Sequence, residues 1–175
     1  MFRIQHITAA VFALATAGAA QAQGLDTDWS GAYAGVSVGA GGFDFANGLV
    51  TDDYANFGVH AGYLHDMGNV VVGGEIQHTQ SELDTLAVDM ESNRLKGILG
   101  YDAGAFMAYG VAGVADADIN GTSDTMLVLG AGGSYAINDR FRVGAELIVE
   151  QNDDFNGSGI AVENQEIGLR MDYSF

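Results

Sequence analysis

One short stretch of the sequence has the residue types and spacing of a calcium-binding loop. Asp116, Asp118, Asn120 and Asp124 occupy positions one, three, five and nine of such a loop, and Gly121 stands at its sharp bend. Oxygen ligands at this spacing could wrap a hard cation, so the stretch is a candidate Ca²⁺ site. The position that usually supplies a bidentate glutamate is a leucine, and an acidic hairpin turning at Asn-Gly is the alternative interpretation. No other cofactor is predicted.

Catalysis is the second kind of chemistry to consider. It would need a serine or a histidine beside a positioned base. After residue 22 the histidines are His60, His65 and His78, and only His78 has a serine and a carboxylate close in sequence, Ser81 and Glu82. Adjacency in sequence does not aim these side chains at one another, and no enzyme motif surrounds them. We therefore predict no catalytic residue.

Acidic residues dominate the charge of the chain, which has a formal net charge of −17 from 23 acidic and 6 basic residues. Such a charge excludes nucleic acid as a partner, because phosphate would be repelled. Many acids gather in or beside four predicted loops that contain no Lys or Arg. They could bind a cationic ligand or divalent ions that bridge lipopolysaccharide, or they could only keep the surface solvated. These acids are Asp44, Asp52, Asp53, Glu82, Asp84, Asp89, Glu91, Asp116, Asp118, Asp124, Asp153, Asp154 and Glu163.

The elements that carry these residues are segments of alternating polarity, each about ten residues long. In a strand, alternate side chains point to opposite faces, so each segment has one apolar and one polar face. The alternation predicts an antiparallel all-β protein of eight strands. The predicted strands are 29–42, 55–65, 69–79, 90–101, 105–115, 125–137, 140–151 and 165–175.

The connections between these strands are predicted to alternate in length. Short turns of Gly, Asp and Asn suit hairpins, while longer acidic linkers suit the opposite end of an up-and-down barrel. The short turns are 66–68, 102–104 and 138–139, and the linkers are 44–54, 80–89, 116–124 and 152–162.

The aromatic residues avoid the strand centres, with Tyr109 as the exception. Two girdles of rings are therefore predicted, one at each membrane boundary. One girdle would contain Trp29, Tyr33, Tyr63, Tyr101, Phe106, Tyr135, Phe141, Tyr173 and Phe175, and the other Phe43, Phe45, Tyr54, Phe57 and Phe155.

Most charged residues of the predicted strands alternate with the apolar ones, so they lie on the face opposite the apolar face. A charge facing lipid costs about 2–4 kcal/mol at mid-depth, so these side chains should face inward and pair with one another. Eight strands leave an interior just wide enough for side chains to fill. The sequence thus predicts a plug of ion pairs with no continuous water path. The predicted network is Glu75, Arg94, Lys96, Arg142, Glu146, Glu150, Glu166, Arg170 and Asp172.

Residues 1–22 are predicted to be a cleaved signal peptide. Arg3 supplies the positive start, an Ala-rich apolar stretch follows, and Ala20-Gln21-Ala22 fits the cleavage pattern, so residues 23–175 would form one mature domain beginning at Gln23. Losing Arg3 would change the formal charge from −17 to −18.

The chain has no cysteine and, after residue 22, no apolar run long enough for a membrane helix. Strands closed into a barrel are the other way to cross a bilayer.

A resemblance to a known family rests on two parts of the chain. The opening Trp29-Ser-Gly-Ala-Tyr33-Ala-Gly35, followed by Gly39, resembles the start of small outer-membrane barrels of the OmpA and OmpX kind, and especially the "porin family" surface proteins of alphaproteobacteria. The alternating segment that ends at Phe175 resembles the terminal strand that the barrel-assembly machinery reads. The resemblance implies a monomeric eight-stranded transmembrane β-barrel, with Tyr173 and Phe175 in the assembly signal.

Together these observations predict a structural or surface-interaction barrel in the bacterial outer membrane of a Gram-negative cell. Its long loops would be extracellular and its termini periplasmic. Its expected partners are outer-membrane lipid, including lipopolysaccharide, and the barrel-assembly machinery during insertion. The alternatives are a small porin-like pore, a secreted soluble β-barrel binding protein such as a lipocalin, and a lipid-modifying outer-membrane enzyme.

Overall fold

The structure is a computed structural model that describes residues 27–45, 50–83, 89–119, 122–152 and 161–175. The predicted signal peptide, its cleavage site and Gln23 lie outside these ranges. Within them no helix is long and apolar enough to cross a bilayer.

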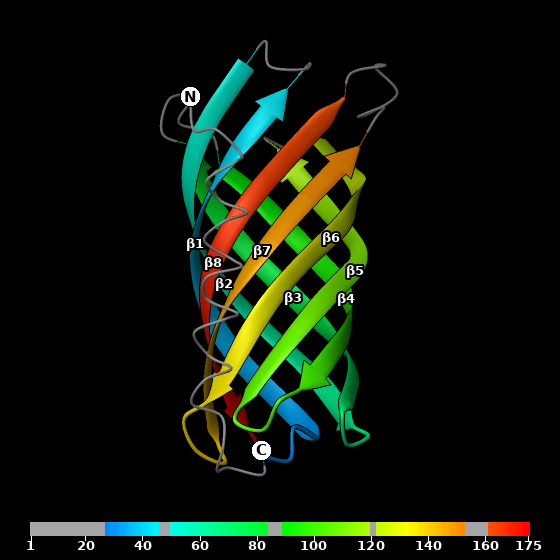
Figure 1. The fold of residues 1–175 in the computed structure, drawn as a ribbon. Coiled ribbons are helices and arrows are strands. Elements are labelled where there is room, and N and C mark those ends of the chain that lie inside the picture. The colour runs from blue at the N-terminus through cyan, green and yellow to red at the C-terminus, as the bar shows by residue number, and fades with distance from the viewer. Residues whose placement is uncertain (1–26, 46–49, 84–88, 120–121, 153–160) are drawn as a thin grey trace.

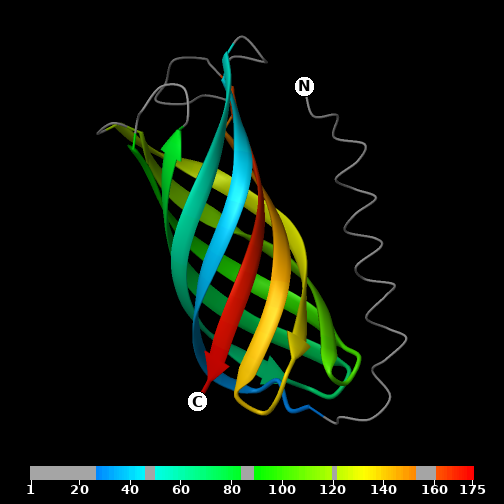
Figure 2. The same ribbon diagram turned by 90° about the vertical axis from the view of Figure 1, so that its left-hand side faces the viewer.

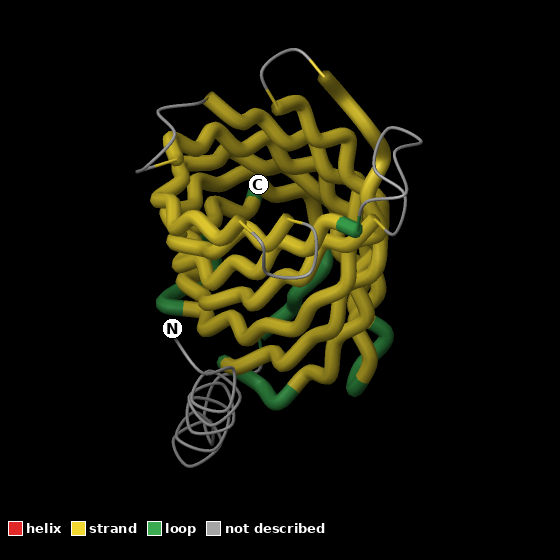
Figure 3. The backbone as a smooth tube through the Cα atoms, turned by 90° about the horizontal axis from the view of Figure 1, so that it is seen from above, coloured by secondary structure: helices red, strands yellow, loops and turns green. Residues whose placement is uncertain are grey.

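Eight antiparallel strands make up the described chain, as the alternation predicts. Each strand pairs with its neighbours in sequence, and the first pairs with the last, so the sheet closes into a barrel with no free edge (Figures 1 and 3). The strands are β1 (Gly31–Phe45), β2 (Val50–Asp66), β3 (Val70–Leu83), β4 (Asp89–Asp102), β5 (Phe106–Ile119), β6 (Thr122–Ala136), β7 (Phe141–Asn152) and β8 (Val162–Ser174).

At one end of the barrel each turn lies within one residue of its predicted bounds, whereas at the other end the connections are shorter than predicted. The end that carries turns 67–69, 103–105 and 137–140, together with Phe175, is called the turn end here. Gly68 and Gly104 have φ values of 99° and 81° there, a left-handed conformation that favours glycine. The opposite end, called the loop end, is reached by strands that continue further than predicted (Figure 2).

The longer strands shorten three of the four predicted linkers. The connections at the loop end are 46–49, 84–88, 120–121 and 153–161, so only the last is close to its predicted bounds of 152–162. The polar and acidic residues predict that these strands end earlier than they do. A strand end that projects beyond the membrane still forms backbone hydrogen bonds with the neighbouring strand, and it needs no apolar face. Strands of 12 to 17 residues exceed the about 9–11 needed to cross a bilayer, which leaves room for such projections.

The outer wall of the barrel is apolar, and the inner face holds the charges. Exposed large apolar side chains occur on every strand, among them Val38, Ile76, Leu95 and Leu169. Lys96, which neighbours Leu95 on the opposite parity, is buried inside. This is the reverse of a soluble barrel, which would place its apolar parity inward, so the lipocalin alternative is wrong.

One of the two predicted aromatic girdles is present at the turn end. Tyr63, Tyr101, Tyr135, Phe141 and Phe175 are exposed on the outer wall there. Such a ring of amphipathic side chains marks the level of lipid head groups.

Three rings assigned to girdles lie inside the barrel instead. Trp29, Tyr33 and Tyr54 are buried. Tyr33 and Tyr54 are at inward-facing positions of β1 and β2, and Trp29 precedes β1 at the turn end. At the loop end Phe57 is exposed on the wall as predicted. The side chains of Phe43 and Phe45, and all of Phe155, lie outside the described part of the structure.

Candidate functional site

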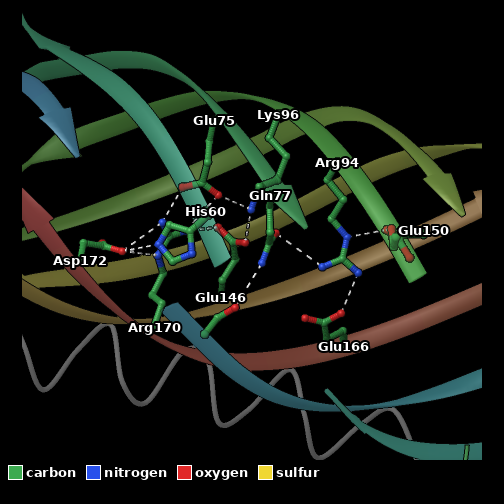
Figure 4. A network of polar contacts seen from close by, with 12 residues as sticks. His60, Glu75, Gln77, Arg94, Lys96, Glu146, Glu150, Glu166, Arg170 and Asp172 are labelled. Carbon is green, nitrogen blue, oxygen red and sulfur yellow. Dashed lines mark hydrogen bonds and ion pairs between the residues drawn. The ribbon is translucent and has the colours of Figure 1, made fainter. Parts of the chain in front are cut away.

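The most highly organised part of the molecule is a network of charged side chains across the middle of the barrel (Figure 4). Strands β3, β4, β7 and β8 supply its charges, each from the inward parity. The network has two parts, defined here by their central cations. The Lys96 cluster contains His60, Glu75, Lys96, Glu146, Arg170 and Asp172, and the Arg94 cluster contains Arg94, Glu150, Asn164 and Glu166.

Lys96 lies between two carboxylates of the Lys96 cluster. Its Nζ is 2.7 Å from Glu75 Oε1 and 2.6 Å from Glu146 Oε1, and the side chain is fully buried. The register explains the first contact, since Lys96 lies directly opposite Glu75 on the neighbouring strand. The second contact crosses the barrel lumen from β4 to β7, so it depends on closure of the sheet.

Arg170 joins the same carboxylates from the other side. Its Nη2 is 2.5 Å from Glu75 Oε2 and 3.3 Å from Asp172 Oδ1, and its Nη1 is 3.1 Å from Glu146 Oε2. The Tyr33 hydroxyl donates a further hydrogen bond to Glu75 Oε2 at 2.6 Å. Glu75 is therefore held by two cations and a phenol, which compensates for removing its charge from water.

His60 completes the Lys96 cluster. Its Nε2 lies 2.5 Å from Asp172 Oδ1, and both side chains are buried. Gly35 makes this contact possible. A Cβ at that position would lie 2.5 Å from His60 Nε2 and 2.7 Å from Asp172 Oδ1, closer than atoms can approach.

The Arg94 cluster lies nearer the loop end. Arg94 Nε is 2.7 Å from Glu150 Oε1, and its Nη2 is 2.7 Å from Glu166 Oε2. Asn164 donates to the second oxygen of Glu150 at 2.7 Å and accepts from the Tyr54 hydroxyl at 2.7 Å. One guanidinium thus holds carboxylates from β7 and β8 while it is itself anchored on β4.

Two apolar clusters cover the network, one on each side along the barrel axis. Trp29, Tyr33, Leu64, Val71, Ile98, Met107, Tyr109, Val111 and Ala136 form the one at the turn end. Ala115, Ala117, Met126, Val128, Ile148 and Val162 form the one at the loop end. All these side chains are buried, as are the charged side chains of the network.

Trp29 closes the turn end of the interior. Its Nε1 donates to Asp102 Oδ1 at 3.2 Å and to the Gly104 carbonyl at 3.1 Å, which ties it to the β4–β5 turn. The Arg142 guanidinium lies 4.8 Å from the centre of its ring and donates to the Trp29 carbonyl at 3.3 Å. On the exposed approach to this residue, a hydrogen bond from the Ser30 backbone N–H lowers the pKa of Asp28 below its usual value.

The structure places all nine predicted network residues inside the barrel, and eight of them form ion pairs with one another. Arg142 differs from the prediction, because in the described ranges its charge is used in the contact with Trp29 rather than in an ion pair with a carboxylate. The register places Arg142 opposite Ala136 on one side and opposite Asp172 on the other, but the Asp172 carboxylate is engaged by His60 and Arg170.

Sequence reasoning missed the neutral members of the network. His60, Tyr33, Tyr54 and Asn164 all follow the inward parity of their strands, and that parity was the available signal. Parity alone places these side chains inside, but a lone histidine or tyrosine in a strand does not reveal its partner across the lumen.

The predicted calcium loop is part of a hairpin. Asp116 and Asp118 lie on β5 opposite Thr125 and Ser123, and Asp124 lies on β6 opposite Ala117. Directly opposed residues share a face, so Asp116 and Asp118 are on the outer face and Asp124 on the inner face. The prediction that these residues form one loop is therefore wrong. Among the described residues no group of three or more His, Asp or Glu is arranged to hold a metal ion, and Asn120 lies outside them.

The conceivable catalytic cluster is also separated by the fold. His78 is on the outer wall, where its Nδ1 lies 2.8 Å from Asn93 Oδ1, whereas Ser81 is buried inside. Residues three apart in a strand point to opposite faces. The side chain of Glu82 lies outside the described part of the structure.

The two residues of the predicted assembly signal lie on the outer wall at the turn end. Tyr173 contacts Phe141 and Phe175 edge-on, with ring centres 5.4 and 5.2 Å apart. Their role in assembly stays a prediction.

A closed eight-stranded barrel with an apolar wall and a charged, filled interior defines a class, the small outer-membrane β-barrels. Residues 7–175 match the family described as the outer membrane protein beta-barrel domain, and the chain belongs to that family. It is thus a bacterial outer-membrane barrel. A comparison of the sequence with curated proteins gave no match.

Solved structures of three small barrels are similar to this fold. Neisserial surface protein A (NspA) is 18% identical with a TM-score of 0.54, and 83% of this chain aligns with 98% of NspA. Ail, the attachment invasion locus protein of Yersinia pestis, is 19% identical with a TM-score of 0.53 over 83% of this chain and 99% of Ail. The outer membrane enzyme PagL is 13% identical with a TM-score of 0.54 over 77% and 97%. At these identities the likeness concerns the fold alone.

Proposed function

We propose that this protein is a non-conducting, monomeric outer-membrane barrel that acts through its surface at the loop end. The observation that carries the proposal is the closed interior: paired charges fill the middle layer, and apolar clusters cover it on both sides. A barrel with no water path leaves its wall and its two ends as the places where a ligand can act. A small pore, the alternative, would need unpaired inward charges lining an open channel.

The loop end carries the charges suited to such contacts. Asp53, Glu91 and Glu163, called the acidic rim here, are exposed on the outer wall near the ends of β2, β4 and β8. The five Lys and Arg residues after residue 22 are Arg94, Lys96, Arg140, Arg142 and Arg170, and the described strands place none of them on the loop-end surface. A cationic partner is therefore the chemistry that this end favours.

The names of the similar barrels do not distinguish between a surface role and a catalytic role for this chain. NspA is named a surface protein and Ail an attachment protein, whereas PagL is named an enzyme. The separation of His78 from Ser81 supports a function without catalysis for this chain. Outer-membrane lipid, including lipopolysaccharide, and the barrel-assembly machinery are further proposed partners. The finer likeness to OmpA-type and porin-family proteins stays a prediction.

The orientation in the membrane is part of the proposal, with the loop end outside the cell and the turn end in the periplasm. The absence of cysteine makes a clean test possible, because one engineered thiol is then the only one in the chain. Ser123→Cys at the loop end should react with a membrane-impermeant maleimide on intact cells. Asn138→Cys at the turn end should react only after lysis, and the reverse pattern would contradict the orientation.

Binding by the acidic rim can be tested on the protein in vesicles. Wild-type protein should retain polylysine at low salt, should release it at high salt, and should not retain polyglutamate. A variant carrying Asp53→Asn, Glu91→Gln and Glu163→Gln should retain less polylysine at an unchanged folded fraction. Equal retention by wild type and variant would contradict a role for the rim.

A further inference from the structure

A groove of about 540 Å³ crosses the outer wall over strands β2 to β6. Ile76, Leu95 and Val114 line its apolar part and are neighbours across the strands, since Leu95 pairs with Ile76 on one side and Val114 on the other. Cross-strand neighbours are only about 5 Å apart, so these side chains form a continuous apolar row. The groove has the volume of a typical small-molecule site, about 300–1,000 Å³.

The next row of the same groove is polar. Asn93 pairs with His78 on one side and Asp116 on the other, one step closer to the loop end than the apolar row. The His78 Nδ1 and Asn93 Oδ1 atoms are 2.8 Å apart, so their contact fixes both side chains at the groove. Asp116 adds an exposed carboxylate.

The polar row lies at the level expected for lipid head groups. Phe106, which lies opposite the girdle residue Tyr135, is on the same strand as Asp116, β5. At about 3.3 Å per residue and a strand tilt of about 40°, the run between them spans about 25 Å along the barrel axis. That is the approximate height of the apolar band of an outer-membrane barrel.

We propose that this groove binds one lipid whose head group carries a primary ammonium ion. Its acyl chain would lie along Ile76, Leu95 and Val114, and its ammonium would donate hydrogen bonds to Asp116 and Asn93. The charge of the groove favours this head group over an anionic one. Arg94, which borders the groove, is directed into the barrel and bound by Glu150 and Glu166, so its charge is already compensated.

A second groove of the outer wall serves as an internal control. It has a volume of about 560 Å³ and crosses β1 and β5 to β8, with Val38, Ala131, Ala145 and Leu169 in its lining. Apart from the hydroxyl of Tyr135, the side chains that face outward there are apolar. It can hold an acyl chain but offers no carboxylate to a head group.

The test is native mass spectrometry of the membrane-extracted protein with phosphatidylethanolamine or phosphatidylglycerol of identical acyl chains. Wild type should retain one phosphatidylethanolamine at least about fivefold more often than phosphatidylglycerol, a preference of roughly 1 kcal/mol. Asp116→Asn should remove the preference, and Leu95→Trp, which fills the groove, should reduce retention of both lipids. Ala131→Trp in the second groove should leave the preference unchanged.

Two results would overturn the proposal. One is equal retention of the two lipids by wild type, and the other is an undiminished preference in Asp116→Asn. Because Asp116 is exposed on the wall, its replacement by the isosteric asparagine should leave the barrel folded. If the polylysine test supports binding by the acidic rim but the lipid test fails, only the lipid site is contradicted and the proposed surface function is unaffected.

Discussion

The barrel interior and the acidic rim use carboxylates in opposite ways. Inside, each carboxylate of the network contacts at least one cation at 3.3 Å or less. At the rim, Asp53, Glu91 and Glu163 face solvent on strand ends that carry no Lys or Arg on the described outer surface.

This difference separates charges that hold the fold from charges that are available to partners. Removing the cation that pairs with a buried carboxylate lowers the stability of the fold by several kcal/mol, because the remaining charge has neither water nor a counterion. A rim carboxylate stays hydrated, so its replacement changes stability little. The interior charges thus contribute to the stability of the barrel, whereas the rim carboxylates are the ones proposed to contact a partner.

The largest expected effect is that of Arg170→Ala, because Arg170 contacts Glu75, Glu146 and Asp172. Breaking a buried ion-pair network by removing one partner costs about 3–5 kcal/mol. Urea unfolding of the protein in lipid vesicles measures the loss. The double variant Arg170→Met with Asp172→Asn should recover part of the stability, since Lys96 still holds the two glutamates. A loss no larger than that of a rim variant would contradict the account.

Gly35→Ala is expected to cost less, about 1–3 kcal/mol, through overpacking. The added methyl group would collide with the Met171 backbone carbonyl and with the His60 and Asp172 side chains, and would push the His60–Asp172 contact apart. Gly168→Ala is the matched control on the same inner face, since its Cβ would meet the Val38 carbonyl at 3.6 Å and Glu166 Oε1 at 3.8 Å, ordinary contact distances. Equal unfolding midpoints for the two variants would contradict the packing described here.

Arg142→Ala should destabilise by about 0.5–2 kcal/mol, the range of a cation–π contact from exposed to desolvated sites. Because Trp29 is the only tryptophan, its fluorescence reports on the turn end directly. The emission should shift to the red as water reaches the ring. Arg142→Lys should show a smaller shift. An unchanged spectrum in Arg142→Ala would mean that Arg142 does not cover Trp29.

Rim variants are expected to have the smallest effect. Asp53→Ala should change the free energy of unfolding by at most about 0.5 kcal/mol. Added Ca²⁺ should raise the unfolding midpoint only weakly, and Asp118→Ala should leave that response in place, because the candidate ligands lie on both faces of a hairpin. A large Ca²⁺ stabilisation that Asp118→Ala abolishes would restore the calcium site.

Much of the fold could be predicted from the sequence because its dominant signal is local. Alternation in segments such as 165–175 shows which side chains share a face, and eight segments suffice to close a barrel. The strand ends were harder to predict, since projections beyond the bilayer have no apolar face to mark them. Residues 116–119 therefore have the composition of a loop, although they continue β5.

The network residues could be predicted as a set but not as pairs. The parity of Lys96 and Glu146 indicates that both face inward, yet their contact crosses the lumen between β4 and β7. Such contacts depend on the shear of the closed barrel, which no local pattern contains. The same limit explains why Arg142 was expected to form an ion pair and instead contacts Trp29.

Recordings from planar bilayers test the closed interior most directly. The purified wild-type protein should insert without steady, well-defined conductance steps, because the Lys96 and Arg94 clusters are paired and the clusters around Trp29 and Met126 cover them. Reproducible channels that are absent from a mock preparation would contradict the account and would make a small pore the better description of this protein.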